Sequence, residues 1–150
     1  MAPSPLKDQF SEAALRARVI ADAVGVLEAE VKDKSGLGGL AIKAAFGVIK
    51  NVSPGILKRL VDGLLNEFSE AVEPFYQKAV AGGRTPGAAV VAEPGPVANA
   101  LLGVTDRRAA RASGDIVKKT YEKLRPTASK HVEAATPRLG GLLDRHAQPG

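Results

Sequence analysis

The chain has 150 residues, of which 45% are hydrophobic and 25% charged, values typical of one folded domain rather than a disordered protein. It contains no cysteine, which excludes disulfides, thiolate metal ligands and a cysteine nucleophile and fits a reducing compartment. The net charge is +5, and the whole excess lies in the second half, where residues 76–150 carry twelve basic and six acidic side chains. This asymmetry favours either an anionic partner or a solvated basic face.

Residues 1–9 contain two prolines and no periodic pattern, so we predict a flexible N-terminal arm there. They lack the charged start and apolar core of a secretory signal, and no stretch of the chain is long and apolar enough to span a membrane. From residue 11 to about residue 31, apolar side chains recur at helical spacing and predict the first helix. Arg16 and Glu30 fall on its apolar side, so the pattern is imperfect.

The segment 37–52 predicts a second helix with an unusually broad apolar face, on which Lys43 and Lys50 share only a narrow polar strip. Its length of about 24 Å is short of the roughly 30 Å hydrocarbon layer, so it does not span a membrane. It either lies on a membrane surface or is buried by other helices. Because it is rich in Gly and Ala and the chain has no Trp to anchor it in lipid, we expect burial at the centre of a bundle.

The third helix, residues 54–73, is the most regular, and Pro74 predicts a kink before a short helix that ends near residue 81. Residues 82–96 are rich in Pro and Gly and predict a connection within the domain, with one helical turn at 88–92. Helix then resumes near Pro96 and continues, with little or no break at Ser113 and Gly114, to Pro126.

Two short helices are predicted after Pro126, at 127–135 and from Pro137 onward, before a flexible tail at 147–150. The predicted architecture is therefore a single all-α domain over residues 10–146, a bundle of six or seven helices.

Motifs that carry catalysis or cofactor binding are missing from the sequence. His131 and His146 lack the spacing of a metal site, and we expect both to be exposed. The sequence GLGG has no following lysine and no preceding strand, so it is neither a phosphate loop nor a dinucleotide fingerprint. We predict no catalytic residue, no cofactor and no metal.

Basic side chains concentrate in the stretch TDRRAARASGDIVKKTYEKLR, where Thr105 or Asp106 is a candidate N-cap. Arginines in such a pattern bind phosphate or a partner's carboxylates, unless Asp106 and Glu122 pair with them within the chain. The stretch has no helix-turn-helix pattern and no aromatic stacking platform, so only weak, non-specific nucleic-acid binding is expected of it. The candidate anion-binding or partner-binding residues are Arg107, Arg108, Arg111, Lys118, Lys119 and Arg125.

The phrases DKSG, VSP, EPF, VTDRRA and KHVEAATPRLG lie in two blocks, residues 28–77 and 100–143. In these blocks the chain resembles a family of small, helical bacterial proteins of unknown function. The resemblance implies a single domain and a cytoplasmic location, and it transfers no functional residue.

We therefore predict a non-enzymatic cytoplasmic helical-bundle protein that acts through protein–protein contacts, with an unknown partner or with its own copies. The alternative is peripheral binding to an anionic membrane or lipid, or weak non-specific binding of nucleic acid, through the basic helix around residues 107–125.

Overall fold

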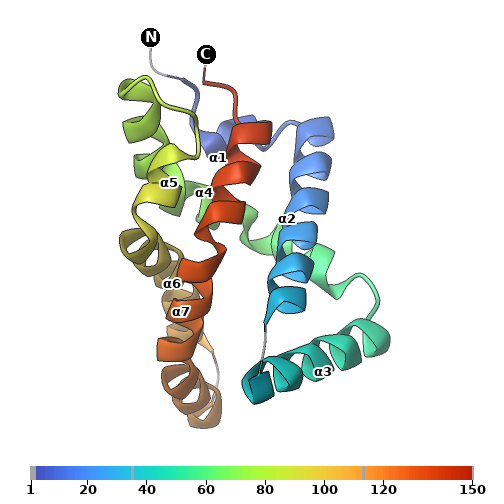
Figure 1. The fold of residues 1–150 in the computed structure, drawn as a ribbon. Helices are drawn as coiled ribbons and strands as arrows, with labels where there is room; N and C mark the ends of the chain where they lie inside the picture. The colour runs from blue at the N-terminus through green and yellow to red at the C-terminus, as the bar shows by residue number, and fades with distance from the viewer. Residues whose placement is uncertain (1–2, 35, 113, 150) are drawn as a thin grey trace.

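The computed structural model describes residues 3–34, 36–112 and 114–149, and all regular structure within these ranges is helical (Figure 1). The prediction of an all-α bundle with six or seven helices is confirmed. The predicted continuation across Ser113 falls partly outside the described residues; α6 ends before it and α7 begins after it. The helices are α1 Leu6–Gln9, α2 Ala13–Asp33, α3 Gly36–Val52, α4 Ile56–Ala81, α5 Ala88–Ala92, α6 Pro94–Arg111 and α7 Asp115–His146.

The hydrophobic core lies at the end of the molecule where the two termini meet (Figure 1). Within the predicted arm, Leu6 belongs to α1 and is fully buried, and its N–H donates a 2.8 Å hydrogen bond to Glu73 of α4. The hydroxyl of Tyr76 donates to the carbonyl oxygen of Gln148, which ties the predicted tail to α4 as well. Both chain ends thus take part in the packing. The largest fully buried side chains are Tyr76, Phe10, Leu6, Val19, Val90, Val97, Val104 and Thr136.

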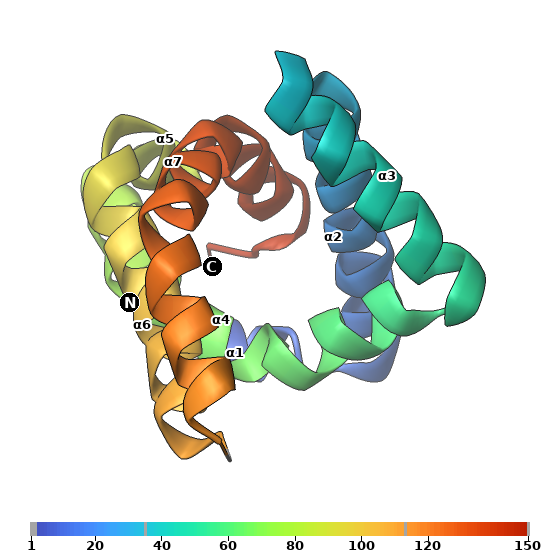
Figure 2. The same ribbon diagram turned by 90° about the horizontal axis from the view of Figure 1, so that it is seen from below.

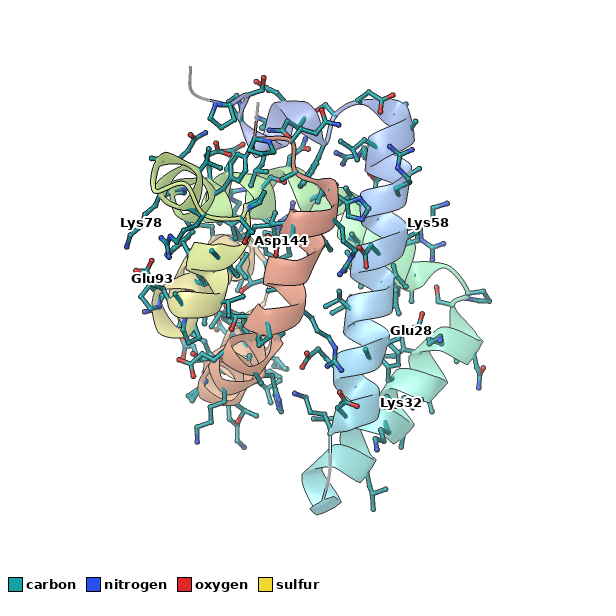
Figure 3. The ribbon with its side chains drawn as sticks, turned by 45° about the horizontal axis from the view of Figure 1, so that its top comes forward. Glu28, Lys32, Lys58, Lys78, Glu93 and Asp144 are labelled. Atoms are coloured by element: carbon teal, nitrogen blue, oxygen red, sulfur yellow. The ribbon has the colours of Figure 1, made fainter. Side chains whose placement is uncertain are left out.

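Two glycines let α5 approach α7 closely. A Cβ atom at position 87 would lie 2.0 Å from the carbonyl oxygen of Gly140, so only glycine fits there without moving a backbone. The N–H of Gly87 donates a 2.8 Å hydrogen bond to Asp144. On the outer side of this contact, Lys78 of α4 and Glu93 point toward one another and pair at 2.9 Å (Figure 3).

Charged residues on the inner side of α2 make ion pairs with other helices. Arg16, which breaks the apolar pattern in the sequence, bonds Asp62 of α4 at 2.9 Å. Glu30, the second irregular position, pairs with Arg138 of α7 at 2.7 Å. Asp22 bonds Arg145, and it also bonds His146, whose side chain is only 14% exposed. The expectation that His146 is exposed is therefore wrong, because α7 packs it against α2.

The helix that was predicted to end near residue 81 does so, since α4 runs through Pro74 to Ala81. The predicted end at Pro126 is wrong: α7 runs through both Pro126 and Pro137 to His146, so the two predicted short helices belong to one continuous element. A proline removes one backbone hydrogen bond but leaves the rest of the ladder intact. In α7 the packing of both of its halves against α6 and α2 stabilises the continuous helix.

The central expectation about the second helix is wrong. α3 lies at the edge of the molecule, where its main contacts are with α2 and α4, and it is not enclosed by a bundle (Figure 2). Leu40, Val48 and Val52 are each more than 60% exposed. The sequence shows that α3 has a broad apolar face but does not show that any helix of the chain covers it.

Candidate interaction surfaces

α3 is attached to α2 by its polar side. The Nζ atom of Lys50 lies 3.2 Å from Oε2 of Glu28 on α2 and 5.7 Å from the ring centroid of Phe46. Lys43, Phe46 and Lys50 line a shallow groove of about 420 Å³ between the two helices. Glu28 lies on the side of α2 that faces α3 (Figure 3). Because the lysine strip faces α2, the apolar side of α3 turns to solvent.

We call the outward side of α3 the α3 face. At about 100° per residue its members span a continuous arc of the helix, and every one of them is exposed. The described members carry no charge, and Asn51 alone among them has a polar side chain. The α3 face comprises Leu40, Ala41, Ala44, Ala45, Val48, Asn51 and Val52.

The second surface is the α6–α7 tip, which we define as residues 107–111 of α6 and 115–125 of α7. It lies at the end of the molecule opposite to the two termini (Figure 1). Ile116 is 81% exposed and Val117 is 52% exposed, so aliphatic side chains are presented to solvent beside the basic ones. The α6–α7 tip is therefore both cationic and apolar.

A network of hydrogen bonds holds the two helices of the tip together. Arg125 donates to both carboxylate oxygens of Asp106, at 2.8 and 2.9 Å, and Tyr121 donates to the same carboxylate. The hydroxyl groups of Tyr121 and Thr105 lie 2.7 Å apart. Bonding to Arg125 and then to Tyr121 lowers the pKa of Asp106, and burial together with the bond to Asp106 raises the pKa of Tyr121. Asp106 is thus an ionised link within α6, and since α6 begins at Pro94, neither of the candidate N-caps, Thr105 and Asp106, caps this helix.

The structure gathers all six candidate basic residues on the α6–α7 tip but assigns them different contacts. Arg108 bonds Glu67 and the carbonyl oxygen of Gly63 on α4, and Arg125 is engaged by Asp106. Both are therefore structural cations. The remaining four make no ion pair with any residue in the described ranges, and Lys123, which we did not single out, shares this property. These freely solvated cations are Arg107, Arg111, Lys118, Lys119 and Lys123.

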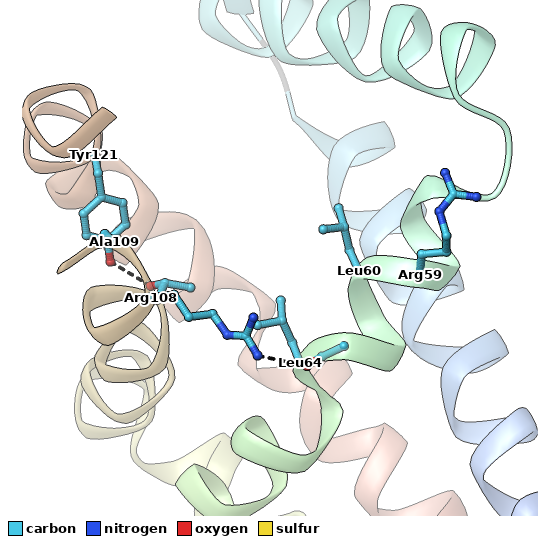
Figure 4. Close-up of a pocket in the computed structure, with 8 residues that line it drawn as sticks. Arg59, Leu60, Leu64, Arg108, Ala109 and Tyr121 are labelled. Carbon is cyan, nitrogen blue, oxygen red and sulfur yellow. Dashed lines mark hydrogen bonds between the residues drawn. The ribbon is translucent and has the colours of Figure 1, made fainter. Parts of the chain in front are cut away.

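Between α4 and the tip lies an open groove of about 520 Å³ (Figure 4). Leu60 and Arg59 line it from α4, and Arg108, Ala109 and Tyr121 line it from the other side. The polar groups of its wall already have partners within the chain, since Arg59 bonds Ser53 at 2.9 Å.

The charge run of the sequence predicts the basic tip. The apolar side of α3 was expected to be buried, and the exposure of Ile116 was not predicted. Both belong to amphipathic helices, and the pattern of such a helix does not tell whether its apolar side meets the protein or the solvent. Within the described part of the chain, no three His, Asp or Glu side chains converge on a point where they would hold a metal ion.

No single described helix is long and apolar enough to cross a membrane; α3 from Gly38 and α4 reach the required length only as a pair bent by 100°. Residues 6–147 match a family whose description is "Family of unknown function (DUF6918)". Neither the curated proteins nor the solved structures include a match.

Proposed function

We propose a role for this chain, which belongs to the family of unknown function DUF6918, from the surfaces that it exposes. It is a non-enzymatic cytoplasmic helical-bundle protein that acts through protein–protein contacts. The partner in this proposal is a second copy of the chain, bound with α3 against α3. The observation that carries the proposal is the outward orientation of the uncharged, apolar α3 face. The lack of cysteine agrees with a reducing cytoplasm.

The size of the exposed apolar area supports an interface. On the α3 face, Leu40, Val48 and Val52 are 63%, 61% and 78% exposed, and the three alanines among them are exposed as well. Together they offer roughly 400 Å² of apolar surface, an area at which the largest patches on monomers tend to be functional. Covering this patch with a partner removes the unfavourable contact between these side chains and water.

The side chains of the α3 face suit another helix better than lipid. Ala41, Ala45, Val48 and Val52 are spaced by four, three and four residues, which is the seam of a heptad. Small residues on such a seam let two helices approach closely and interdigitate. A helix that lies in a membrane surface gains its energy from bulky apolar residues, which this seam lacks.

The lack of charge favours a second copy over an unrelated partner. In a symmetric dimer each residue lies near its own counterpart, so a charged face repels itself and an uncharged one does not. Lys43 and Lys50 lie on the opposite side of α3, next to α2, and stay away from the seam. Two such faces would bury roughly 800 Å² in total, less than the 1,200 Å² of standard complexes, so the dimer is weak and reversible.

Sedimentation velocity over a wide concentration range tests the proposal. The wild-type chain is expected to shift from monomer toward dimer as its concentration rises into the submillimolar range, whereas the variant V48D/V52D stays monomeric. Both valines are more than half exposed, so the variant keeps its fold, which far-UV circular dichroism checks. The matched control is I116D/V117D, which places the same charges on the tip and should dimerise like the wild type.

A cysteine cross-link locates the contact, since the natural chain has no thiol of its own. Ala45→Cys, near the middle of the seam, should form a disulfide-linked dimer on mild oxidation, and Ile116→Cys should not. A wild-type chain that remains monomeric at submillimolar concentration, or equal cross-linking of the two cysteine variants, would refute self-association through α3.

A further inference from the structure

We infer that the α6–α7 tip is a docking site for a lipid bilayer that contains anionic phospholipid, a site that goes beyond the proposed contact through α3. The tip lies at one end of the molecule (Figure 1). It presents five freely solvated cations and three exposed aliphatic side chains, which are Ile116, Val117 and Leu124. The acidic residues near them are Asp115 and Glu122, so the solvated charge of the tip remains positive.

The geometry of α7 places an aliphatic residue on the same side of the helix as two lysines. Ile116, Lys119 and Lys123 follow one another at i, i+3 and i+7 and therefore share one side of the helix. Ile116 is 81% exposed, and both lysines are exposed beside it. In a bilayer surface the isoleucine enters the apolar layer while the lysine chains extend to the phosphate groups.

The tip is also rigid enough to present this arrangement. Asp106 holds Arg125 and Tyr121 from α6, which fixes the start of α7 against its neighbour. Arg108 bonds Glu67 and so joins the tip to α4. These internal pairs consume two of the cations named from the sequence and leave the other four, together with Lys123, for the bilayer.

Nucleic acid fits the same cations less well. Binding to a phosphate backbone gains nothing from exposed Ile116 and Val117, whereas insertion into a bilayer removes both from water. Tyr121, the only aromatic residue of the tip, is held in hydrogen bonds to Thr105 and Asp106 and is not free to stack on a base. The combination of cations and aliphatic residues therefore favours an anionic bilayer.

Flotation with vesicles of phosphatidylcholine, with and without phosphatidylserine, tests the inference. The full chain should float with the anionic vesicles at low salt, lose most of this binding at high salt, and ignore the neutral ones. Each cation near an anionic surface contributes about a fivefold factor in affinity, so R111A/K119A/K123A should bind about a hundredfold more weakly. The matched control R18A/K58A/R84A removes three exposed cations from other elements and should bind like the wild type.

A second measurement follows the insertion itself. The chain has no tryptophan, so Ile116→Trp gives a single fluorescent reporter, whose emission should shift to the blue with anionic vesicles. Val48→Trp on the α3 face, which lies at the same end of the molecule, should shift little (Figure 1). V48D/V52D separates this site from the proposed dimer: it should lose self-association and keep binding to vesicles.

Three results would overturn the inference. The first is a wild-type chain that does not float with anionic vesicles at low salt. The second is vesicle binding that V48D/V52D abolishes and R111A/K119A/K123A leaves intact, which would move the lipid contact to α3. The third is salt-dependent binding to a DNA duplex without any binding to vesicles, which would make the tip a nucleic-acid surface.

Discussion

The close contact between α5 and α7 predicts a large loss of stability when Gly87 is replaced by alanine. In Gly87→Ala the new Cβ would lie 2.0 Å from the carbonyl oxygen of Gly140 and 2.5 Å from its carbonyl carbon, which are both backbone atoms of α7. They cannot rotate away, so α5 must move. The shift weakens the bond from the Gly87 N–H to Asp144 and disturbs the fully buried side chain of Val90. We expect a loss of about 3 kcal/mol in the free energy of unfolding.

Alanine substitutions at two other glycines should change the free energy of unfolding by less and serve as comparisons. In Gly140→Ala the new Cβ would meet a methyl group of Val91 at 2.4 Å and the carbonyl oxygen of Gly87 at 3.0 Å. The half-exposed valine can turn aside and the backbone oxygen needs only a small shift, so the expected loss is about 2 kcal/mol. In Gly25→Ala nothing lies within 4 Å, and the better helix propensity of alanine should stabilise α2 by up to about 1 kcal/mol. Urea unfolding followed by far-UV circular dichroism measures all three. A Gly87→Ala variant as stable as the wild type would refute the close approach of α5 to α7.

Two further predictions concern ion pairs between helices. Hydrogen bonds from Arg145 and then from His146 lower the pKa of Asp22 from its ordinary value of 3.8, so this stabilisation is present above pH 3.8 and is lost as the pH falls through the lowered pKa. Asp22→Asn should reduce the free energy of unfolding by about 1 kcal/mol at neutral pH and flatten its fall in acid, measured by urea titrations at several pH values. Arg16→Ala leaves Asp62 without its partner and should cost about 1 kcal/mol in the same assay, whereas Arg16→Lys should recover part of it.

The sequence of α2 predicted its helix well and marked the positions that needed a partner. Arg16 and Glu30 interrupt the apolar side. Arg16 bonds the carboxylate of Asp62 and the side-chain amide of Asn66 on α4, and Glu30 pairs with Arg138 on α7. A charge inside an apolar stripe therefore indicates an ion pair between helices. The identity of the partner does not follow from the sequence, because it depends on how α2, α4 and α7 are arranged in space.

Helix ends were harder to predict where proline is involved. Pro126 predicted the end of a helix, and α7 continues through it because the cost of one missing hydrogen bond is smaller than the gain from packing. Gly114, in contrast, has a φ of 94° just before α7 begins, a conformation that suits glycine alone. α7 therefore begins directly after a residue whose backbone conformation is not helical and suits glycine.

The two proposed surfaces arise from one arrangement: an amphipathic helix that is attached by its polar side exposes its apolar side. In α3 the attached side carries Lys50, held by Glu28, and the outward side carries the uncharged seam. In the first turns of α7 the attached side carries Tyr121 and Arg125, held by Asp106, and Ile116 points to solvent. Apolar periodicity alone cannot identify this case, since it is the same for a buried helix. The orientation of the helix depends instead on its polar strip. A cation of this strip pairs with a carboxylate on the neighbouring helix, and the pair holds the polar strip against that helix. Because the residues that form the proposed surfaces are exposed, they can change by mutation with little effect on the stability of the fold.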